Sequence, residues 1–575
     1  MNLFFDYQHK IFNSLKNFEK KKLIKIPDQI KNFTVELPPK NQKADISCNA
    51  AMILAKVNNT SAVKLAEVLK EHLLSKFREF KSIEIAGPGF LNIYFQTSFW
   101  NQYLTKIIKL NYKYGSNRST KKKYNIEFVS ANPTGPLHVG HCRGAILGDV
   151  ISNLLIFNGN KVTKEYYVND SGGQVKNFVS SVYYRILEII KNKPFPANED
   201  LYPGNYVIDI ARRIIKKKSI NNYSNFEKIY KKLSSESLKH SMQLIVDNLK
   251  LLGVKHNNFI YESKLIENKM VLKIVNKLKK ENYIYEGELE PPKGEQIDNW
   301  KIRNQLLFKS TAFGDDTDRP LQKSDGSWTY FAGDIAYHAN KISRRFDVLI
   351  NILGADHAGY TKRIMSASKA ISKDRVKLIC KVSQLVKLFK NGEPFIMSKR
   401  KGEYITVEDL INEVGKDSTR FMMLNRSNDV ELDFDFIKVT EKSKDNPVFY
   451  VQYAYARINS IFRLLKLNLK NKINLNNKKF TLNQYEIEIL KKICEWPKCV
   501  ELSSSKLEPH RIPFYLYELV TLFHSYWNLG KENKEFRFAN KDKSIKNSRL
   551  VLLQALSIVI KNALLILGVS TPTRM

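Results

Sequence analysis

The segment from residue 124 to residue 168 constrains the fold of this chain more than any other. Residues 124–129 form an apolar run typical of a buried strand, and the Pro- and Gly-containing stretch 130–136 predicts a turn directly after it. A helical pattern covers residues 140–157, and a second strand is predicted at 161–168. This order of strand, loop, helix and strand is the opening of a parallel nucleotide-binding sheet, with the ligand at the loop.

The length of the chain requires several domains, because 575 residues exceed what one hydrophobic core supports. Residues 1–112 predict an N-terminal α+β module. Residues 120–440 predict a Rossmann-like parallel-sheet catalytic domain, interrupted by a helical insertion at about 180–320. Residues 441–575 predict an all-α helical bundle. The fold class expected is therefore multidomain α/β.

Apolar spacing places the remaining elements. In the N-terminal module it predicts helices at 4–19, 48–57 and 61–77 and strands at 82–86 and 90–95. A long helix is indicated at 237–252, and strand signals then resume at Trp328–Phe331, Val348–Leu353 and Lys377–Ser383. Beyond Asn446 only helical spacing remains, with later stretches near 484–500, 512–529 and 546–567.

The charge balance indicates a polyanionic partner. Lys and Arg number 94 against 57 Asp and Glu, which gives a formal net charge of +37. Such a field attracts nucleic acid. The alternative is that Lys, Asn and Ile are simply abundant throughout, as an AT-biased genome would produce.

Cysteine usage and hydropathy indicate a cytoplasmic protein. The five cysteines, at 48, 142, 380, 494 and 499, include no CxxC pair, so neither a zinc knuckle nor a disulfide framework is predicted. Polar residues interrupt the N-terminal apolar residues before a signal-peptide core forms, and no run of about 18 apolar residues occurs. Export and a membrane partner are both disfavoured.

Two histidines lie three residues apart at the junction between the first predicted strand and the helix that follows it. In His138-Val139-Gly140-His141, the glycine lets phosphate approach the backbone, and the helix N-terminus supplies unpaired N–H groups. The histidines can donate to phosphate oxygens as negative charge builds. Taken alone, the pair could equally be ordinary packed histidines.

A basic loop lies about 260 residues further along the chain. It reads Met397-Ser398-Lys399-Arg400-Lys401-Gly402 and follows the strand-like residues 394–396. A lysine in such a loop can reach phosphates. Taken alone, it would be a solvated charge cluster in a Lys-rich chain.

Together the two motifs resemble the HIGH and KMSKS signatures of class I aminoacyl-tRNA synthetases. Here they read HVGH and IMSKR, with Val139, Ile396 and Arg400 departing from the family pattern and Lys399 retained. The resemblance implies catalytic roles for His138, His141 and Lys399. It also implies that ATP is a substrate, that Mg²⁺ binds together with ATP, and that the enzyme contains no zinc. It also implies an ATP-binding set: Leu137, Val139, Gly140, Asp356, His357, Met397 and Ser398. Asp356 could instead cap the following helix.

Within that class the whole chain is most similar to the arginyl-tRNA synthetases. The resemblance of residues 127–141 and 328–337 implies that arginine is held by Glu127, Ser130, Asn132, Tyr330 and Asp334. Tyr330 and Asp334, spaced i and i+4, would share a helix face. A carboxylate and a tyrosine can distinguish a planar guanidinium from the ammonium of lysine. The alternative for this pair is a surface helix start that Asp334 caps. The similar segment 167–174 is predicted to organise a turn.

The terminal modules of the chain resemble the family's RNA-binding domains. Residues matching Phe90 and Asn92 would stack on and hydrogen bond an unpaired base of the tRNA elbow. The alternative for Phe90 is that its ring packs in the core of the module. In the helical bundle Tyr453 is expected to contact tRNA, while Gln452 and Arg457 could face either RNA or the core. The partners implied are tRNA(Arg), L-arginine and ATP, and a monomer is expected.

Other classes of protein remain to be weighed. A nucleotidylyltransferase would use the same histidines but would not explain the terminal modules. A non-catalytic RNA-binding paralogue would show a damaged site, whereas His138, His141, Asp334 and Lys399 are intact. Among synthetases, the absence of zinc ligands disfavours specificity for cysteine. An acidic substrate pocket disfavours specificity for glutamate, because like charges repel.

Overall fold

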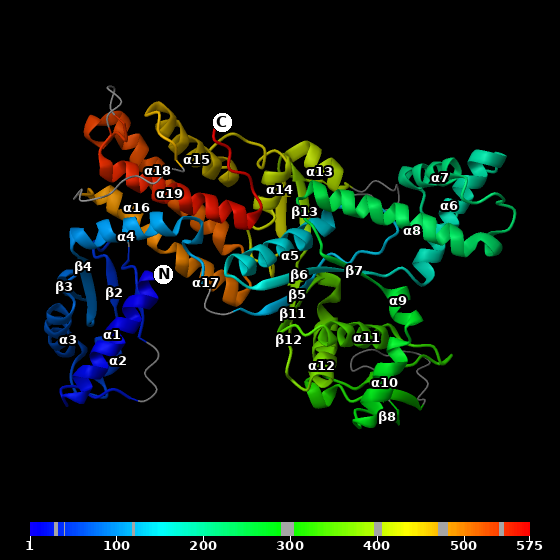
Figure 1. The fold of residues 1–575 in the computed structure, drawn as a ribbon, viewed down its shortest axis with the longest axis horizontal. Helices are drawn as coiled ribbons and strands as arrows, with labels where there is room; N and C mark the ends of the chain where they lie inside the picture. The colour runs from blue at the N-terminus through cyan, green and yellow to red at the C-terminus, as the bar shows by residue number, and fades with distance from the viewer. Residues whose placement is uncertain are drawn as a thin grey trace. The chain divides into compact units, whose positions relative to one another are not determined.

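The computed structural model describes residues 1–27, 33–39, 41–117, 121–288, 304–395, 405–469, 481–539 and 545–575. They form two compact units (Figure 1). One unit is Arg118–Glu441, and the other joins Met1–Asn117 to Lys442–Met575. The N-terminal module and the helical bundle therefore share one unit although they lie at opposite ends of the sequence.

The Arg118–Glu441 unit is built on a five-stranded parallel sheet with the order β12-β11-β5-β6-β7. Its strands are β5 (Lys123–Glu127), β6 (Lys161–Val168), β7 (Asn258–Tyr261), β11 (Val348–Gly354) and β12 (Lys377–Ser383). The predictions for β6, β11 and β12 are confirmed. Because β5 lies between β6 and β11 and all five strands are parallel, their carboxyl ends meet at one edge.

Helix α5 (Val139–Phe157) connects β5 to β6 and is apolar on nearly all sides, as a helix enclosed by the core should be. Its close approach to the chain after β5 depends on Gly148. A Cβ atom at that position would lie 2.3 Å from the ring of Phe128. Glycine therefore lets the middle of α5 pack directly against the residue that follows β5.

The interval 180–320 holds the helices expected there and also several short strands. Helices α6 (Gly173–Lys191), α7 (Asn205–Lys217) and α8 (Phe226–Leu251) pack around a common apolar cluster. After β7 come α9 (Glu262–Glu267), α10 (Met270–Lys280) and an antiparallel sheet of β8 (Ile284–Gly287), β9 (Gln305–Phe308) and β10 (Arg319–Pro320). Among the residues of this interval that the structure describes, the strands have at most four residues, which is too short for a clear alternation of polar and apolar residues.

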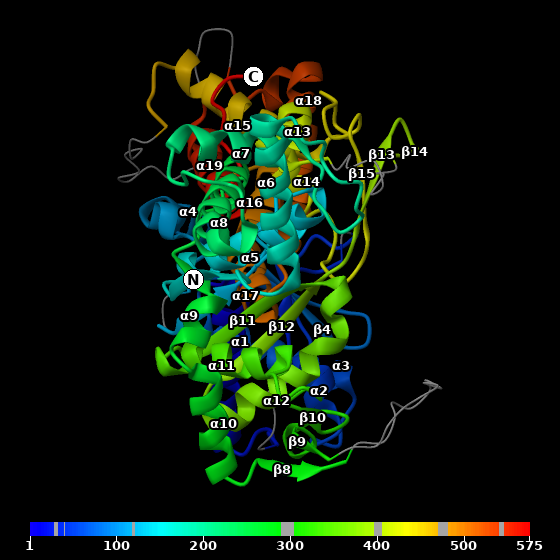
Figure 2. The ribbon, with the colours of Figure 1, turned by 90° about the vertical axis from the view of Figure 1, so that its right-hand side faces the viewer.

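The strand predicted at Trp328–Phe331 is wrong. Thr329 accepts a hydrogen bond from the Ala332 amide at 3.3 Å, and helix α11 (Tyr330–Ser343) begins there. The aromatic residues favoured a strand, but the threonine cap ends the extended stretch. Helix α11 packs with α10 and α12 (Thr361–Ser372) around a second apolar cluster. The three helices lie below β11 and β12 in Figure 2.

A smaller three-stranded sheet completes this unit. It consists of β13 (Val386–Lys390), β14 (Glu393–Pro394) and β15 (Leu432–Asp435), in the order β14-β13-β15. Helices α13 (Val407–Val414) and α14 (Lys416–Met422) precede β15. Arg143 of α5, only 2% exposed, donates to the carbonyl oxygens of Gln384, Ser427 and Val430 and so ties this region to α5.

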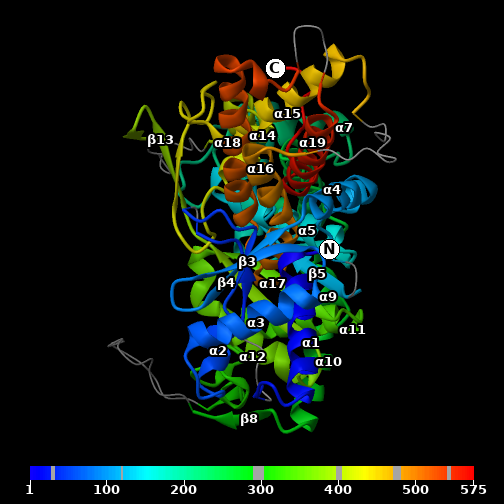
Figure 3. The same ribbon diagram turned by 90° about the vertical axis from the view of Figure 1, so that its left-hand side faces the viewer.

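The other unit begins with an antiparallel sheet of order β1-β2-β4-β3 and its helices (Figure 3). The elements are α1 (Leu3–Lys20), β1 (Val35–Glu36), β2 (Ile46–Cys48), α2 (Ala50–Ala55), α3 (Ala62–Lys76), β3 (Phe80–Ala86), β4 (Phe90–Phe95) and α4 (Thr97–Leu110). The bundle comprises α15 (Pro447–Leu464), α16 (Gln484–Cys494), α17 (Trp496–Lys506), α18 (Arg511–Glu532) and α19 (Asn547–Leu567). The stretch predicted at 484–500 thus divides into two helices, with Pro497 at the start of the second.

Buried polar contacts join the module to the bundle inside this unit. The Tyr114 hydroxyl donates to the Ile493 carbonyl at 3.0 Å, and the Trp496 indole donates to the Tyr114 carbonyl at 3.1 Å. Helix α19 is long and apolar enough to cross a membrane, with a mean hydropathy of 2.2. Since 89% of that window is buried inside the protein, α19 is the core helix of the bundle.

Candidate active site

The two histidines of HVGH form a reciprocal cap at the start of α5. His138 is the N-cap residue, its Nδ1 accepts from the Gly140 amide at 3.2 Å, and its own amide donates to Nδ1 of His141 at 3.3 Å. The two ring centroids are 4.0 Å apart. Because each Nδ1 accepts, a neutral ring carries its proton on Nε2. Both histidines therefore offer an Nε2–H donor next to a helix N-terminus.

Burial favours the neutral form of His141, and the glycine between the two histidines leaves room for the cap. Burial, and secondarily His138, lowers the pKa of His141 to about 3. Leu137 and Val139 are buried, whereas Gly140 is exposed. A Cβ atom at Gly140 would come within 2.9 Å of the His138 ring, so only glycine leaves the cap undisturbed.

The chain that follows the second motif runs beside the first. The Val139 amide donates to the Ile405 carbonyl at 3.0 Å, and the Val407 amide donates to the Leu137 carbonyl at 3.0 Å. His138 and Thr406 form an isolated antiparallel bridge. Met397, Ser398 and Lys399 themselves lie outside the described residues.

The backbone is strained immediately after β5. Val129 and Ser130 have φ angles of 71° and 41°. A β-branched residue in this region is unusual, and such strain typically costs about 1–3 kcal/mol and gathers at functional sites. The resulting bend lets Ser130 Oγ donate to Glu127 Oε1 at 3.1 Å and accept from the Tyr167 amide at 3.1 Å. Asn132 donates to Gln174 at 2.5 Å in the same loop.

Asp334 lies on α11 and receives a hydrogen bond from the Tyr360 hydroxyl at 2.5 Å. Burial raises the pKa of Asp334 to about 7; Glu127 and Glu262 add to the rise, while Tyr360 and Lys341 oppose it. The capping alternative for Asp334 is wrong, because Thr329 caps α11. Tyr330, at the start of the helix, is 74% exposed.

Glu262 is a further acidic group that the sequence did not single out. It opens α9, and its carboxylate accepts from Ser171 Oγ at 2.5 Å and from the Asn169 amide at 2.6 Å in the orientation that satisfies that amide's neighbours. Asp170 accepts from Ser263, so the segment predicted as a turn also anchors the start of α9. An isolated glutamate carries no sequence signal, which explains why it was missed.

Glu127, Glu262 and Asp334 lie close enough together to interact electrostatically, since both glutamates raise the pKa of Asp334. Burial raises the pKa of the Tyr167 hydroxyl, and Glu262, Asp334 and Glu127 raise it further. Three carboxylates, from β5, α9 and α11, therefore lie near one tyrosine. Such a group of carboxylates favours a cationic ligand with several N–H donors.

Asp356 and His357 follow β11 at the same edge of the sheet. Both side chains are exposed, and His357 Nε2 lies 3.3 Å from Asp356 Oδ2. The idea that Asp356 caps the next helix is wrong, because the N-cap position of α12 is Tyr360. Among the residues described, no group of three or more His, Cys, Asp or Glu side chains could hold a metal ion.

The residues considered for RNA contacts differ in exposure. Phe90, at the start of β4, is 37% exposed, whereas Asn92 is 4% exposed and donates to Gln42 at 2.6 Å. In the bundle, Gln452 faces the interior and donates to the Ser570 carbonyl at 3.1 Å. Arg457 stacks on Tyr453, with 4.2 Å between its guanidinium carbon and the ring centroid.

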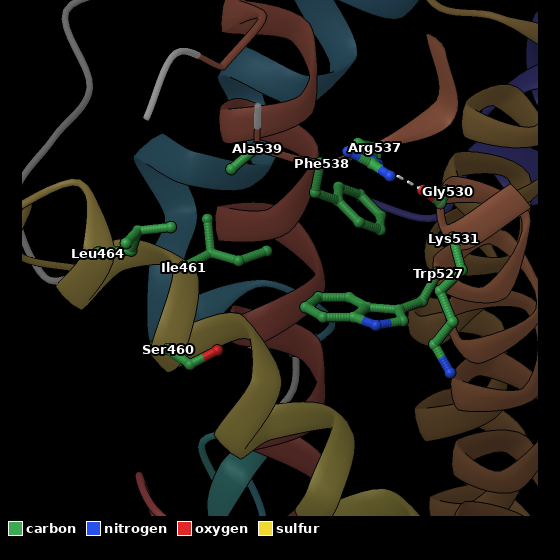
Figure 4. Close-up of a pocket in the computed structure, with 9 residues that line it drawn as sticks. All are labelled: Ser460, Ile461, Leu464, Trp527, Gly530, Lys531, Arg537, Phe538 and Ala539. Carbon is green, nitrogen blue, oxygen red and sulfur yellow. Dashed lines mark hydrogen bonds between the residues drawn. The ribbon is translucent and has the colours of Figure 1, made fainter. Parts of the chain in front are cut away.

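A pocket of about 470 Å³ lies beside the stacked Arg457 and Tyr453. Trp527 lines this pocket, and the centroid of its ring is 4.9 Å from the guanidinium carbon of Arg457. In Figure 4 the indole of Trp527 and the ring of Phe538 lie at the same hollow. Its lining consists of Ser460, Ile461, Leu464, Trp527, Gly530, Lys531, Arg537, Phe538 and Ala539. Aromatic rings combined with cationic side chains suit nucleic-acid bases and phosphates.

Comparisons with known proteins agree along the whole chain. Residues 103–460 match a family model described as "tRNA synthetases class I (R), catalytic domain". Residues 7–95 match "Arginyl tRNA synthetase N terminal domain", and residues 451–575 match "DALR anticodon binding domain".

Other full-length proteins are similar to this chain, some in sequence and some in three-dimensional structure. An arginine–tRNA ligase of Pelagibacter ubique is 56% identical over 577 residues, and one of Allorhizobium ampelinum is 41% identical over 585 residues; each alignment covers 100% of both chains. The solved arginyl-tRNA synthetase of Thermus thermophilus shares the fold, with a TM-score of 0.73 at 16% identity and 99% of each chain covered. The chain therefore belongs to the arginyl-tRNA synthetases, a family of class I aminoacyl-tRNA ligases that act in translation.

Proposed function

We propose that this enzyme joins L-arginine to tRNA(Arg) in a site at the carboxyl edge of the parallel sheet. The observation that carries the proposal is the pocket of Glu127, Glu262 and Asp334 beside a helix start that presents two Nε2–H donors. The acidic pocket suits the two cationic groups of arginine, and the helix start suits the phosphates of ATP.

The reaction consists of two displacements. The arginine carboxylate attacks the α-phosphorus of ATP, and the bond to the bridging oxygen breaks to release pyrophosphate. The terminal ribose hydroxyl of tRNA then attacks the activated carbonyl and displaces AMP. His138, His141 and Lys399 would stabilise the charge that develops in the first step. Lys399 is six residues before Ile405, whose carbonyl oxygen binds the Val139 amide.

Arginine would be held at both of its ends. Glu127, Ser130 and Asn132, which follow β5, would hold the α-amino end. Asp334 and Glu262 would accept hydrogen bonds from the guanidinium, and exposed Tyr330 is free to close over it. A bidentate carboxylate contact distinguishes the planar guanidinium from the ammonium of lysine.

ATP would lie over the start of α5 and the end of β11. Leu137, Val139 and Gly140 would contact its phosphates through the backbone, and Asp356 and His357 would contact its ribose or adenine. Met397 and Ser398 would complete the set. Synthetases of this class use ATP as substrate, and we infer that Mg²⁺ arrives with the nucleotide and that zinc is not required.

Recognition of tRNA would involve both ends of the chain. Phe90 would stack on an unpaired elbow base and Asn92 would hydrogen bond it, and Tyr453 with its neighbours would contact the anticodon. We propose module boundaries at 1–112, 120–440 and 441–575, and a cytoplasmic monomer.

Arginine-dependent exchange of pyrophosphate into ATP, measured with tRNA present, tests this proposal. Exchange with arginine and none with lysine, glutamate or cysteine is expected. Exchange with any of those three instead of arginine would refute the assigned pocket.

A further inference from the structure

Lys341 is a completely buried lysine whose ammonium lies between two strands of the parallel sheet. Its Nζ donates to the carboxylate of Glu127 and, at 2.9 Å, to Oδ1 of Asn351, while its side chain is 0% exposed. Glu127 and Asn351 are register partners on β5 and β11. The ring centroid of Tyr337 is 4.4 Å from the same nitrogen. One ammonium thus joins the carboxyl ends of both strands.

A hydrogen-bond chain continues from Asn351 to the backbone of Asp334. His338 Nε2 lies 2.9 Å from Asn351 Nδ2, and His338 Nδ1 lies 2.8 Å from the Asp334 carbonyl oxygen. A carbonyl oxygen only accepts, so Nδ1 of His338 carries the proton and Nε2 accepts from the amide. The Asn351 oxygen is then directed at Lys341. Asp334, His338 and Lys341 follow an i, i+4, i+7 spacing along one face of α11.

We propose that Lys341 is a positioning residue for arginine: its ammonium orients the Glu127 carboxylate and offsets one negative charge of the acidic pocket. This inference rests on the proposed roles of Glu127 and Asp334. When Asp334 is ionised, the carboxylates of Glu127, Glu262 and Asp334 share the buried cation of Lys341. Arginine adds an ammonium and a guanidinium, while its own carboxylate is the group directed at ATP, so three cationic groups face the three carboxylates of the site.

The charge of Lys341 also acts on Asp334. The groups that act on Asp334 include the Tyr360 hydroxyl, the carboxylates of Glu127 and Glu262, the Lys341 ammonium and the Tyr167 hydroxyl, and Arg319 and Arg363 act in turn on Tyr360. Burial and the two carboxylates raise the pKa of Asp334, and Lys341 lowers it. Removal of the ammonium should therefore raise the pH at which Asp334 becomes able to bind a guanidinium. A purely structural lysine would not move this pH.

Substitutions that separate charge from size test the proposal. Lys341→Gln removes the charge, Lys341→Arg keeps it, and Lys387→Gln is the control at an exposed lysine of the same unit, 2.6 Å from Glu431. The measurements are KM for arginine, KM for ATP, and kcat/KM for arginine against pH. For Lys341→Gln we expect arginine KM to rise about tenfold with ATP KM changed less than about twofold. In the profile of kcat/KM for arginine against pH, the acid limb of Lys341→Gln should move up by about half a pH unit. Lys341→Arg and the control should keep the wild-type acid limb.

A Lys341→Gln enzyme with wild-type arginine KM and pH limb would overturn the inference, as would equal rises in the KM values for arginine and ATP. If Lys341→Gln fails to fold, Asn351→Ala tests the inference instead. This variant keeps the Lys341 ammonium but removes one of the two oxygen atoms to which the ammonium donates. A raised arginine KM at unchanged ATP KM then supports the inference, and an unchanged arginine KM overturns it. A wild-type enzyme that does not charge arginine would instead refute the proposed function.

Discussion

The hydroxyl of Tyr360 donates to the carboxylate of Asp334 across 2.5 Å, and so connects the chain after β11 to helix α11. Burial raises the pKa of Asp334 to about 7, and the tyrosine hydrogen bond acts in the opposite direction by favouring the ionised form. The carboxylate proposed to bind the guanidinium is thus only partly ionised near neutral pH.

Arginine use should therefore depend steeply on pH. Below the pKa of about 7 the carboxyl is protonated and cannot pair with the guanidinium, so kcat/KM for arginine should fall by about tenfold per pH unit. Tyr360→Phe removes a bond that lowers this pKa, so its acid limb should lie at higher pH. Initial rates from pH 5.5 to 9 check both statements. An acid limb in Tyr360→Phe at or below the wild-type position would contradict them.

Asp334→Asn should stabilise the fold in alkaline buffer while abolishing arginine use. The folded pKa of about 7 lies above the ordinary value of 3.8, so ionisation penalises the folded state increasingly from pH 4 to pH 7. At pH 8 the variant should gain roughly 2–4 kcal/mol in the free energy of unfolding, and at pH 4 little. Thermal melting at the two pH values measures the difference. An equal change at both would show that ionisation is not the cause.

Gly140→Ala should impair ATP use. The added Cβ would meet the His138 ring at 2.9 Å and disrupt the reciprocal cap that fixes the Nε2–H donors. We expect the rate of pyrophosphate exchange to fall by about 10²-fold or more, the range for loss of a preorganised donor. The matched control is Gly144→Ala on the same helix, where a Cβ has no neighbour within 4 Å. Equal losses in the two variants would count against the cap.

Trp527→Ala should weaken tRNA recognition selectively. The indole lines the bundle pocket and stacks near Arg457, so its loss should raise the KM for tRNA by about tenfold, in line with one stacked base. Phe514→Ala, at a 50% exposed ring on the same helix, serves as the comparison. Charging kinetics at varied tRNA concentration provide the measurement. If arginine KM changes instead of tRNA KM, the pocket does not serve RNA.

The sequence predicted the elements whose pattern is long and regular. Strand β6 and strand β12 have the predicted bounds, and the prediction for α19 differs by one residue. The two strands are rich in β-branched and aromatic residues, and α19 is apolar and buried along nearly its whole length. The helix start at HVGH was predictable for the same reason, because a turn-rich loop precedes a long apolar helix.

Features that depend on tertiary contacts were not predictable. Trp328–Phe331 carries strand-forming residues, yet one capping threonine starts a helix there. Glu262 and Lys341 reach the pocket from segments far from Glu127 in sequence, and no local pattern marks either residue. Tyr330 and Asp334 share α11 as expected, but their unlike exposures follow from what packs around the helix.

The most direct test is ATP-dependent attachment of labelled arginine to total tRNA, with wild type, Asp334→Ala and His138→Ala compared and the other amino acids as controls. The account predicts that only arginine is attached and that both variants lose the activity while keeping their fold. Binding of tRNA without transfer of any amino acid, or full activity in Asp334→Ala, would contradict the assigned site.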